Sequence, residues 1–306
     1  MIPLGHVLVV DDEQSSFEMY RDVLTSEGYR VEWAADRASA LSMLHDSAWD
    51  VVVLDQRLSG ERGGDSGIDL VSEIVPTGAK VIVATGYADP AMIDRAFRDG
   101  AYDYLEKLPS LPALLRVKVR NASEAVRERR LSNLSSEQRE VELRELWSAV
   151  RTEPDRNRKG RLLEDLMVLL FKTVQGFTHV DTRRKSKDEE IDIFIRNESS
   201  EAFWVGEQSQ YVIVECKNWS KPAGPNELVI FRDKILNRGG RCRLGFFVAV
   251  GGFTEGFHTR SDTFRKENVV VVPMGPSDLE ELVMSRDRNE LLKKFHARTV
   301  MAGNGH

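Results

Sequence analysis

The fold of the carboxyl-terminal half is decided by the stretch Tyr211-Val212-Ile213-Val214-Glu215-Cys216-Lys217-Asn218-Trp219. Its consecutive apolar residues predict a buried β-strand, and the alternating charges that follow predict that the strand ends at a surface. Successive side chains of a strand point to opposite faces, so Glu215 and Lys217 share one face and Cys216 lies on the other. The strand therefore ends with a carboxylate beside an ammonium group.

A second apolar strand is predicted upstream, within Glu189-Glu190-Ile191-Asp192-Ile193-Phe194-Ile195. Asp192 interrupts its hydrophobic run. A buried carboxylate is costly unless it is paired or holds a metal ion. Asp192, Glu215 and Lys217 are thus candidates for one polar site at the end of a sheet.

These three residues resemble the D…ExK signature of the PD-(D/E)xK nuclease fold, and Glu-Cys-Lys-Asn-Trp is most similar to its Mrr-like restriction-endonuclease branch. The resemblance implies a mixed-sheet α/β domain and a metal-dependent phosphodiesterase, specifically an endodeoxyribonuclease. Asp192, Glu215 and the backbone carbonyl of Cys216 would bind Mg²⁺. Lys217 would position or deprotonate the attacking water and offset developing negative charge.

The resemblance extends over roughly residues 158–275 and implies further site residues. Glu164, on an apolar helix after Gly160, matches an acidic residue that many such enzymes add to the metal site. A solvated carboxylate in the first turn of a helix is the open alternative. Basic residues expected to contact the phosphate backbone of DNA are Arg183, Arg184, Lys185, Lys187, Lys221, Arg241 and Arg243.

The remaining elements of this half are predicted from short apolar runs. The expected strands are Phe177–Thr182, Ala202–Val205, Leu244–Val250 and Val269–Pro273, and a helix is expected at Glu227–Asn237.

Composition limits the class of protein. A chain of 306 residues suggests two domains. No apolar run approaches the roughly 20 residues of a membrane span, and the first residues lack a signal-peptide pattern, so a cytoplasmic protein with no membrane partner is expected. The two cysteines are expected to be reduced core thiols. Residues 1–150 carry 17 Lys and Arg against 26 Asp and Glu, whereas residues 151–306 carry 26 against 23, so only the second half is expected to bind nucleic acid.

The amino-terminal half alternates short apolar strands with amphipathic helices. Strands are predicted at His6–Val10, Arg30–Ala34, Val51–Leu54, Lys80–Ala84 and Asp103–Leu105. Five such βα units predict a doubly wound parallel sheet, whose ligands bind at the carboxyl ends of the strands.

Carboxylates gather at those ends. The first strand leads into Asp11 and Asp12, and the third leads into Asp55. Close carboxylates repel by about 4 kcal/mol per pair at an effective dielectric constant of ~20, so a cation is expected among them. Hard oxygen ligands with room for water favour Mg²⁺.

This arrangement resembles the flavodoxin-like receiver domain of two-component response regulators over nearly all of residues 5–120. The resemblance implies that a histidine kinase phosphorylates Asp55. Asp11 and Asp12 would form the acidic pocket, and Asp12, Asp55 and the backbone carbonyl of Arg57 would bind Mg²⁺ directly. Residues of the receiver switch would be Thr85, Tyr104 and Lys107, with the lysine and the threonine contacting phosphoryl oxygens. The family usually has proline directly after this lysine. Here Leu108 lies between Lys107 and Pro109, so the resemblance does not establish a cis peptide bond at this point.

A helical connector is predicted between the halves, which gives a receiver domain at residues 1–120, a connector at 121–157 and a nuclease domain at 158–306. Apolar residues fall at helical spacing in it, and Ser135 to Gln138 has capping-box spacing. A solvated spacer helix and a short coiled coil that pairs two chains both fit this pattern.

Together the two resemblances predict a response regulator that cleaves DNA in a Mg²⁺-dependent reaction, with a histidine kinase, DNA and a second copy of itself as partners. Such a protein resembles a signal-gated effector of antiviral defence. The alternative is a response regulator that binds nucleic acid without cleaving it; the presence of Asp192, Glu215 and Lys217 together favours cleavage.

Overall fold

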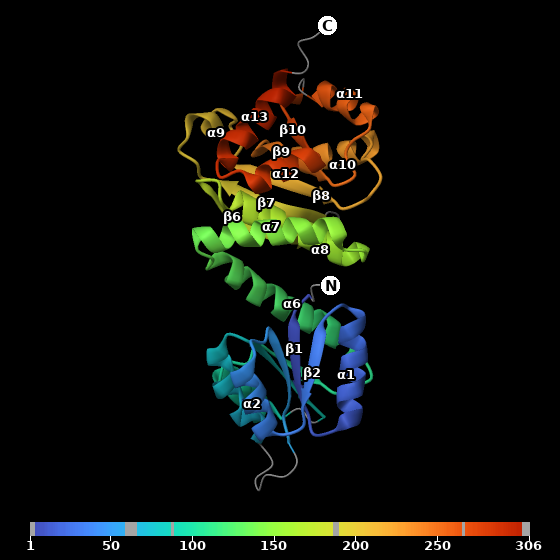
Figure 1. Cartoon of the computed structure of the whole chain (residues 1–306), viewed down its shortest axis with the longest axis vertical. Coiled ribbons are helices and arrows are strands. Elements are labelled where there is room, and N and C mark those ends of the chain that lie inside the picture. Colours follow the sequence, from blue (N-terminus) through green and yellow to red (C-terminus); the bar gives the residue numbers. More distant parts are fainter. Residues whose placement is uncertain (1–3, 59–65, 87–88, 186–189, 265–266, 302–306) are drawn as a thin grey trace. The chain divides into compact units, whose positions relative to one another are not determined.

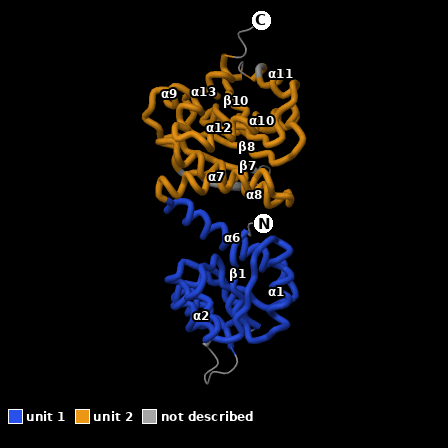
Figure 2. Tube along the Cα trace, viewed as in Figure 1, with its two compact units in different colours: residues 1–134 blue, residues 135–306 orange. Residues whose placement is uncertain are grey.

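The structure is a computed structural model, which describes all residues except 1–3, 59–65, 87–88, 186–189, 265–266 and 302–306. The chain divides into two compact units, Met1–Leu134 and Ser135–His306 (Figure 2). Each unit has its own sheet and its own core.

The first unit is a five-stranded parallel sheet with the strand order β2-β1-β3-β4-β5 (Figure 1). Its strands are β1 (His6–Val10), β2 (Arg30–Ala34), β3 (Val51–Asp55), β4 (Lys80–Thr85) and β5 (Asp103–Glu106). The helices are α1 (Gln14–Ser26), α2 (Arg37–Asp46), α3 (Ser66–Asp69), α4 (Val71–Ile74), η1 (Val75–Thr77), α5 (Pro90–Arg98) and α6 (Leu111–Ser132). The predicted doubly wound sheet is confirmed.

Both faces of this sheet are covered, as the apolar strands require. On one face, Val7 and Val9 of β1 pack with Leu24 of α1 and Leu115 of α6. On the other face, the alternate residues of the strands pack against α2, α4 and α5. The polar residues at the carboxyl ends of the strands therefore lie at one edge of the sheet, next to the apolar cores on its two faces.

The second unit is a mixed sheet with the order β10-β9-β8-β7-β6. Its strands are β6 (Phe177–Lys185), β7 (Glu190–Asn197), β8 (Tyr211–Lys217), β9 (Cys242–Ala249) and β10 (Val270–Met274). β6, β7 and β8 pair antiparallel, and β8, β9 and β10 pair parallel. The helices are α7 (Ser136–Thr152), α8 (Arg156–Phe171), α9 (Ala202–Gly206), α10 (Pro225–Leu236), α11 (Glu255–Phe264), α12 (Pro276–Met284) and α13 (Arg288–Met301). The predicted mixed α/β architecture is confirmed.

Helices cover the two faces of β8 and β9 in this unit. Phe231 of α10 packs edge to face on Phe247 of β9, with ring centroids 5.4 Å apart. Phe171 of α8 packs on Phe246, the neighbouring residue of β9, with centroids 5.1 Å apart. Adjacent residues of a strand point to opposite faces, so α10 and α8 lie on opposite sides of the sheet.

The strand predicted at Ala202–Val205 is wrong, because this segment forms the short helix α9. β7 and β8 pair directly with each other, so no strand can lie between them. The buried Trp204 is the apolar anchor of the helical turn that connects them. A run of four apolar residues does not by itself distinguish a strand from a buried helical turn.

The connector predicted at residues 121–157 does not form a separate element. α6 ends at Ser132, and Ser135 caps α7 in a capping box with Gln138. The apolar positions that suggested a coiled coil are buried within this single chain, at Leu115, Val119, Ala122, Leu143, Leu146 and Val150. They are therefore already used in the cores of the two units.

An ion pair fixes α7 within the second unit. Both guanidinium NH groups of Arg288, at the start of α13, donate to the carboxylate of Glu140, each over 2.7 Å. Arg288 is 3% exposed, and it also donates to the backbone carbonyls of Leu282 and Val283. α7 thus belongs with the nuclease-like fold.

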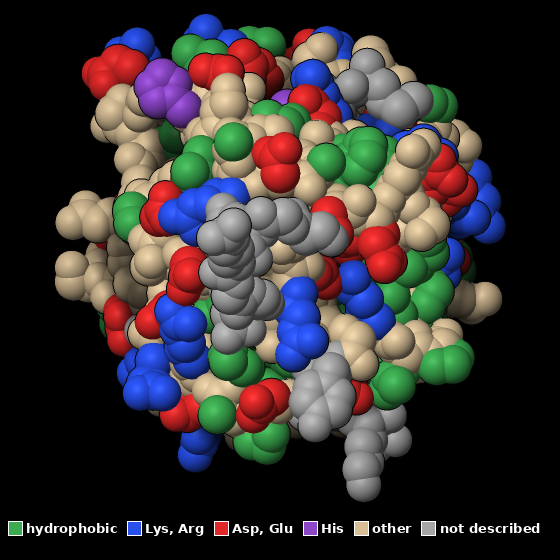
Figure 3. Space-filling view, turned by 90° about the horizontal axis from the view of Figure 1, so that it is seen from below, with side chains coloured by type: hydrophobic (Ala, Val, Ile, Leu, Met, Phe, Trp, Pro, Cys, Tyr) green, Lys and Arg blue, Asp and Glu red, His purple; other side chains and the backbone are tan. Residues whose placement is uncertain are grey.

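None of the described helices combines the length and the apolar character that a bilayer crossing requires. On the face shown in Figure 3, acidic and basic side chains are interspersed.

Candidate functional sites

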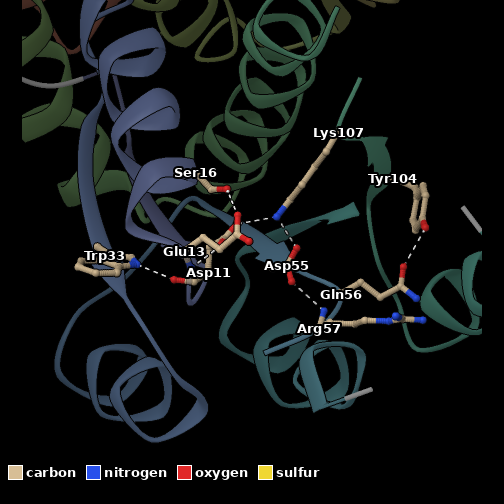
Figure 4. A network of polar contacts seen from close by, with 9 residues as sticks. All are labelled: Asp11, Glu13, Ser16, Trp33, Asp55, Gln56, Arg57, Tyr104 and Lys107. Atoms are coloured by element: carbon tan, nitrogen blue, oxygen red, sulfur yellow. Dashed lines mark hydrogen bonds and ion pairs between the residues drawn. The ribbon is translucent and has the colours of Figure 1, made fainter. Parts of the chain in front are cut away.

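The first site lies at the carboxyl edge of the parallel sheet, where Lys107 bridges two carboxylates (Figure 4). Its Nζ is 2.9 Å from Oδ2 of Asp11 and 2.6 Å from Oδ1 of Asp55. β1 and β3 are neighbouring strands, which brings the residues that follow them together. The sequence-predicted pair of acids and the predicted lysine thus meet in one place.

Backbone groups orient these carboxylates. The amide of Arg57 donates to Oδ2 of Asp55 over 2.9 Å, and the amide of Glu13 donates to Oδ1 of Asp11 over 3.0 Å. The indole Nε1 of Trp33 donates to the carbonyl of Asp11 over 2.7 Å, which secures the loop after β1. Trp33 carries no motif, so the sequence did not single it out.

Burial controls the charges of this site. Asp11 is 1% exposed, and burial raises its pKa, against the opposing effect of Lys107. Burial alone would lower the pKa of Lys107, but its hydrogen bonds to Asp55 and Asp11 outweigh burial and raise it. Lys107 therefore stays charged and neutralises the pocket.

The predicted switch residues lie beside this pocket. The hydroxyl of Tyr104 donates to Oε1 of Gln56 over 3.1 Å and is also hydrogen-bonded to Thr85. The backbone amide of Lys107 donates to the carbonyl of Thr85 over 2.7 Å, which joins the ends of β4 and β5. Gln56 is 1% exposed and was not predicted; its position directly after Asp55 was the only signal.

Tyr20 was also missed by the sequence analysis. It is fully buried in α1, and its hydroxyl has no hydrogen-bond partner in the structure. Burial raises its pKa to about 12, while the nearby Lys107 opposes that effect. The hydroxyl therefore remains protonated beneath the acidic pocket.

The donors of this edge suit a hard divalent cation, because they are carboxylates and backbone carbonyls. Asp12 is half-buried in the loop after Asp11, and Arg57 directly follows the loop residue Gln56. Within the described ranges, no three His, Cys, Asp or Glu side chains already form a metal-binding cluster. In this structure the Lys107 ammonium takes the cationic position between Asp11 and Asp55.

The described part of the chain contains no cis peptide bond, so Leu108 and Pro109 are joined by a trans bond.

The second site lies where β7 begins and β8 ends. The antiparallel register pairs Ile193 with Val214, so Asp192 lies next to Glu215 on the neighbouring strand. Oδ2 of Asp192 accepts a hydrogen bond from the backbone amide of Cys216 over 2.7 Å. Lys217 forms an ion pair with Oε1 of Glu215. The three residues of the D…ExK pattern therefore converge.

Low solvent exposure sharpens the electrostatics of this second site. Glu215 is 5% exposed. Burial, reinforced by the charge of Glu215, raises the pKa of Asp192 to about 6, and the hydrogen bond from Cys216 partly opposes this. Burial lowers the pKa of Lys217, but the charge of Glu215 more than compensates and raises it. Two acids held in a dry site are poised to accept a cation.

Lys234 of α10 is a second lysine in this site. Its Nζ is 2.7 Å from Oε2 of Glu215. It lies outside the D…ExK pattern, so the motif did not identify it. The helical spacing did indicate its direction. Phe231 and Ile235 face the sheet, and Lys234, three residues after Phe231, lies near the same face of α10.

Glu164 lies on the side of the sheet covered by α8. Its charge contributes to raising the pKa of the buried Cys216 thiol, after burial itself and the charge of Asp192. Glu164 is thus close to Cys216, whose side chain points away from that of Glu215. The structure therefore places Glu164 near the end of β8, on the face of the sheet to which the Cys216 side chain points.

Three cations of the described residues lie near the ring of Trp219, just beyond the end of β8. Nζ of Lys221 and Nζ of Lys217 lie 5.2 Å and 5.5 Å from the ring centroid, and Cζ of Arg156 lies 6.0 Å from it. We call Arg156, Trp219 and Lys221 the Trp219 cluster. Lys221 was predicted as a DNA contact, whereas Arg156 was not, since it lies far away in the sequence.

Gly251 explains how the loop of this cluster is held. A Cβ atom at this position would lie 2.6 Å from the carbonyl oxygen of Trp219 and 2.5 Å from that of Lys221. Real Cβ atoms do not approach so closely, so the loop needs glycine here. The turn Gly251-Gly252-Phe253-Thr254 therefore packs against the backbone of the loop that carries Lys221.

Three of the remaining predicted DNA contacts lie on β6. The β6 backbone at Arg183, Arg184 and Lys185 lies beside the start of β7, where Arg184 pairs with Ile191. Lys187 lies outside the described residues.

The expectation that Arg241 and Arg243 flank the acidic site is wrong. β9 is parallel to β8, and Cys242 pairs with Tyr211 at the opposite end of β8 from Lys217. Lys217 lies six positions after Tyr211 in the strand, which corresponds to about 20 Å. Arg243 instead donates to Oε1 of Gln208 over 2.8 Å.

Comparison with known proteins identifies both units. Residues 7–119 match the response regulator receiver domain, and residues 156–273 match the restriction endonuclease family of the Mrr catalytic type. These matches agree with the two sites described above.

Curated relatives are response regulators that share part of their length with this chain. The alginate biosynthesis transcriptional regulatory protein AlgB of Pseudomonas putida is 36% identical over 116 residues, which is 37% of this chain and 25% of the relative. The putative response regulator NtrX-like of Rickettsia conorii is 34% identical over 102 residues, covering 33% and 21%. The DNA-binding response regulator MtrA of Mycolicibacterium paratuberculosis is 32% identical over 115 residues, covering 37% and 49%.

The chain thus spans about a quarter of AlgB and half of MtrA. What it has in common with them is therefore one domain. This protein is a response regulator receiver domain followed by a restriction-endonuclease domain of the Mrr catalytic family.

Proposed function

We propose that this protein is a response regulator whose output is Mg²⁺-dependent cleavage of DNA, controlled by phosphorylation of Asp55. The observation that carries the proposal is the convergence of Asp192, Glu215 and Lys217 at the end of β8. DNA and a histidine kinase are its partners, and both place it in the cytoplasm. Cleavage under signal control suits an effector of antiviral defence.

The receiver pocket supports the phosphorylation step. Asp55 is the nucleophile towards a phosphoryl donor, and Lys107 already contacts the carboxylate oxygen beside which the new phosphoryl oxygens would lie. Asp11, Asp12 and the carbonyl of Arg57 would hold Mg²⁺, which neutralises phosphate charge when bound. The Thr85 hydroxyl can then bond a phosphoryl oxygen, and Tyr104 is free to exchange its present partner Gln56 for an inward position.

The nuclease site supports hydrolysis of a phosphodiester. Asp192, Glu215 and the carbonyl of Cys216 would hold Mg²⁺, which when bound lowers the pKa of a water and neutralises charge at phosphorus. Lys217, which is protonated in its ion pair with Glu215, orients that water and offsets the negative charge that develops at the phosphate. The amide of Cys216 keeps the Asp192 carboxylate turned to the strand end.

The Trp219 cluster supports DNA binding next to this site. Lys221 and Arg156 offer charge to backbone phosphates, and the indole between them offers a flat apolar face. Glu164 is a further candidate for the metal shell, because its charge acts on the nearby Cys216.

Control of cleavage is proposed to pass through pairing of two chains. One site cuts one strand, whereas two paired sites can cut a duplex. The buried apolar residues of α6 and α7 leave other surfaces, rather than a coiled coil, to form that dimer.

The decisive experiment is cleavage of supercoiled plasmid DNA with Mg²⁺, with and without acetyl phosphate. Asp192→Ala and Lys217→Ala are each expected to abolish nicking and linearisation, with circular dichroism unchanged. A folded parent protein that binds plasmid under every condition and never cuts it would instead establish a non-cleaving, nucleic-acid-binding regulator.

A further inference from the structure

The carboxylate of Glu215 is held by two lysines, one on each oxygen. Lys217 contacts Oε1, and Nζ of Lys234 lies 2.7 Å from Oε2. The side chain of Glu215 is 6% exposed, so water does not replace either partner. The oxygens that a metal ion would need are therefore already engaged by ammonium groups.

Lys234 is brought to this position by close packing of α10 on β9. The α10 residues Phe231 and Ile235 are buried against the sheet. A Cβ atom at Gly245 of β9 would lie 2.7 Å from the Phe231 ring and 2.9 Å from Cδ1 of Ile235, so the helix approaches the strand closely at this glycine. The Lys234 side chain is only 12% exposed. It is an internal part of the site and not a surface lysine.

The charges around Glu215 form a neutral set. Asp192 and Glu215 can supply two negative charges, and Lys217 and Lys234 supply two positive ones. Entry of a divalent cation would leave two positive charges in excess, and like charges at this range oppose each other strongly. A DNA phosphate brings compensating negative charge, and it is also a partner to which an ammonium can turn.

We propose that Lys234 is a positioning residue that makes metal binding dependent on DNA. In the DNA-free protein it holds Oε2 of Glu215 and competes with the divalent cation for it. When a DNA phosphate arrives, the ammonium turns to a non-bridging phosphate oxygen and leaves Oε2 to the metal. This inference rests on the proposed nuclease function and adds an order of assembly to it.

The test is the affinity of the DNA-free protein for Mn²⁺, measured by calorimetry. The full chain carries Asp12→Asn and Asp55→Asn, which remove two of the three pocket carboxylates of the receiver and leave Asp11 paired with Lys107. In this background, Lys234→Met is expected to bind Mn²⁺ roughly tenfold more tightly, a difference of about 1.4 kcal/mol. Lys234→Arg keeps the charge and is expected to stay near the parent.

Arg232→Met is the matched control, because it removes a cation of the same helix that pairs with Asp233 and Glu267 instead of Glu215. A second readout separates positioning from packing. Plasmid cleavage by Lys234→Met, with the receiver intact, is expected to saturate at a lower Mn²⁺ concentration and to reach a lower maximal rate. A structural role would lower the rate without shifting the saturation point.

Unchanged or weaker Mn²⁺ binding by a folded Lys234→Met would overturn the inference. Glu215→Gln in the same background distinguishes this failure from failure of the proposed function. If Glu215→Gln abolishes Mn²⁺ binding while Lys234→Met leaves it unchanged, only the role of Lys234 is lost. If Glu215→Gln has no effect, no metal binds at Glu215, and the nuclease proposal fails as well.

Discussion

Asp192 experiences opposing demands at the level of a single residue. A metal site needs its charged form, yet burial and Glu215 raise its pKa to about 6, from 3.8. Between these two values the folded state binds more protons than the unfolded state does. The stabilising contribution of Asp192 is therefore complete below its unfolded pKa and is lost as the pH rises through about 6.

Asp192→Asn is consequently expected to stabilise the metal-free protein at pH 7.5, by on the order of 1–2 kcal/mol, and to have a smaller effect at pH 4. Urea unfolding in EDTA at the two pH values measures this, with the exposed Asp233→Asn as control. An equal shift at both pH values would contradict the assigned cause. Cleavage by the parent is expected to decline as the pH falls through about 6.

The hydroxyl of Tyr20 is a second feature at this scale. It is buried without a hydrogen-bond partner among the described residues, which costs about 1–3 kcal/mol for such a group. Tyr20→Phe removes the hydroxyl and keeps the ring, so the free energy of unfolding of the receiver unit is expected to rise by about 1 kcal/mol.

Tyr104→Phe is the matched comparison, because the Tyr104 hydroxyl bonds to Gln56 and Thr85. It should destabilise the same unit. Thermal unfolding of both variants, followed by circular dichroism, tests the pair. Destabilisation by Tyr20→Phe would show that its hydroxyl has a partner in solution.

At the scale of elements, the ion pair of Glu140 with the buried Arg288 adds to the apolar packing that attaches α7 to the nuclease fold. Glu140→Gln leaves the buried guanidinium of Arg288 without its counter-charge, and breaking such a pair typically costs about 3–5 kcal/mol. Glu140 is itself partly exposed, so we expect a loss of about 2–3 kcal/mol in the second unit.

Glu145→Gln changes an exposed residue of the same helix and is the control. We expect it to change the free energy of unfolding by less than about 0.5 kcal/mol. Chemical unfolding monitored by tryptophan fluorescence provides the measurement, because Trp147 lies buried on α7. Equal effects of Glu140→Gln and Glu145→Gln would contradict this role of the ion pair.

At the scale of the whole molecule, the proposed phosphorylation site and the proposed hydrolytic site lie in separate units. Asp55→Asn is expected to leave basal plasmid cleavage intact, because Asp192, Glu215 and Lys217 lie in the other unit. It should remove the change in cleavage rate caused by acetyl phosphate. The rate ratio with and without acetyl phosphate is the quantity to compare, and an equal ratio for mutant and parent would refute control through Asp55.

Much of the sites could be predicted from the sequence alone, because strand patterns have a period of two and parallel strands end at a common edge. Asp11, Asp55 and Lys107 were found from the residues that follow apolar runs, and Asp192, Glu215 and Lys217 from one interrupted and one alternating strand. The fold class of each half followed from the same patterns.

Only the tertiary structure could reveal contacts between residues distant in the chain. Lys234 contacts Glu215 because α10 packs closely on β9 at Gly245. Arg156 lies next to Trp219 although more than sixty residues separate them in the sequence. The same physical limit misplaced Arg241 and Arg243, because their charges suggested DNA while the parallel register of β8 and β9 placed them at the opposite end of the sheet. Local patterns determine which elements form, whereas packing and register decide which side chains meet.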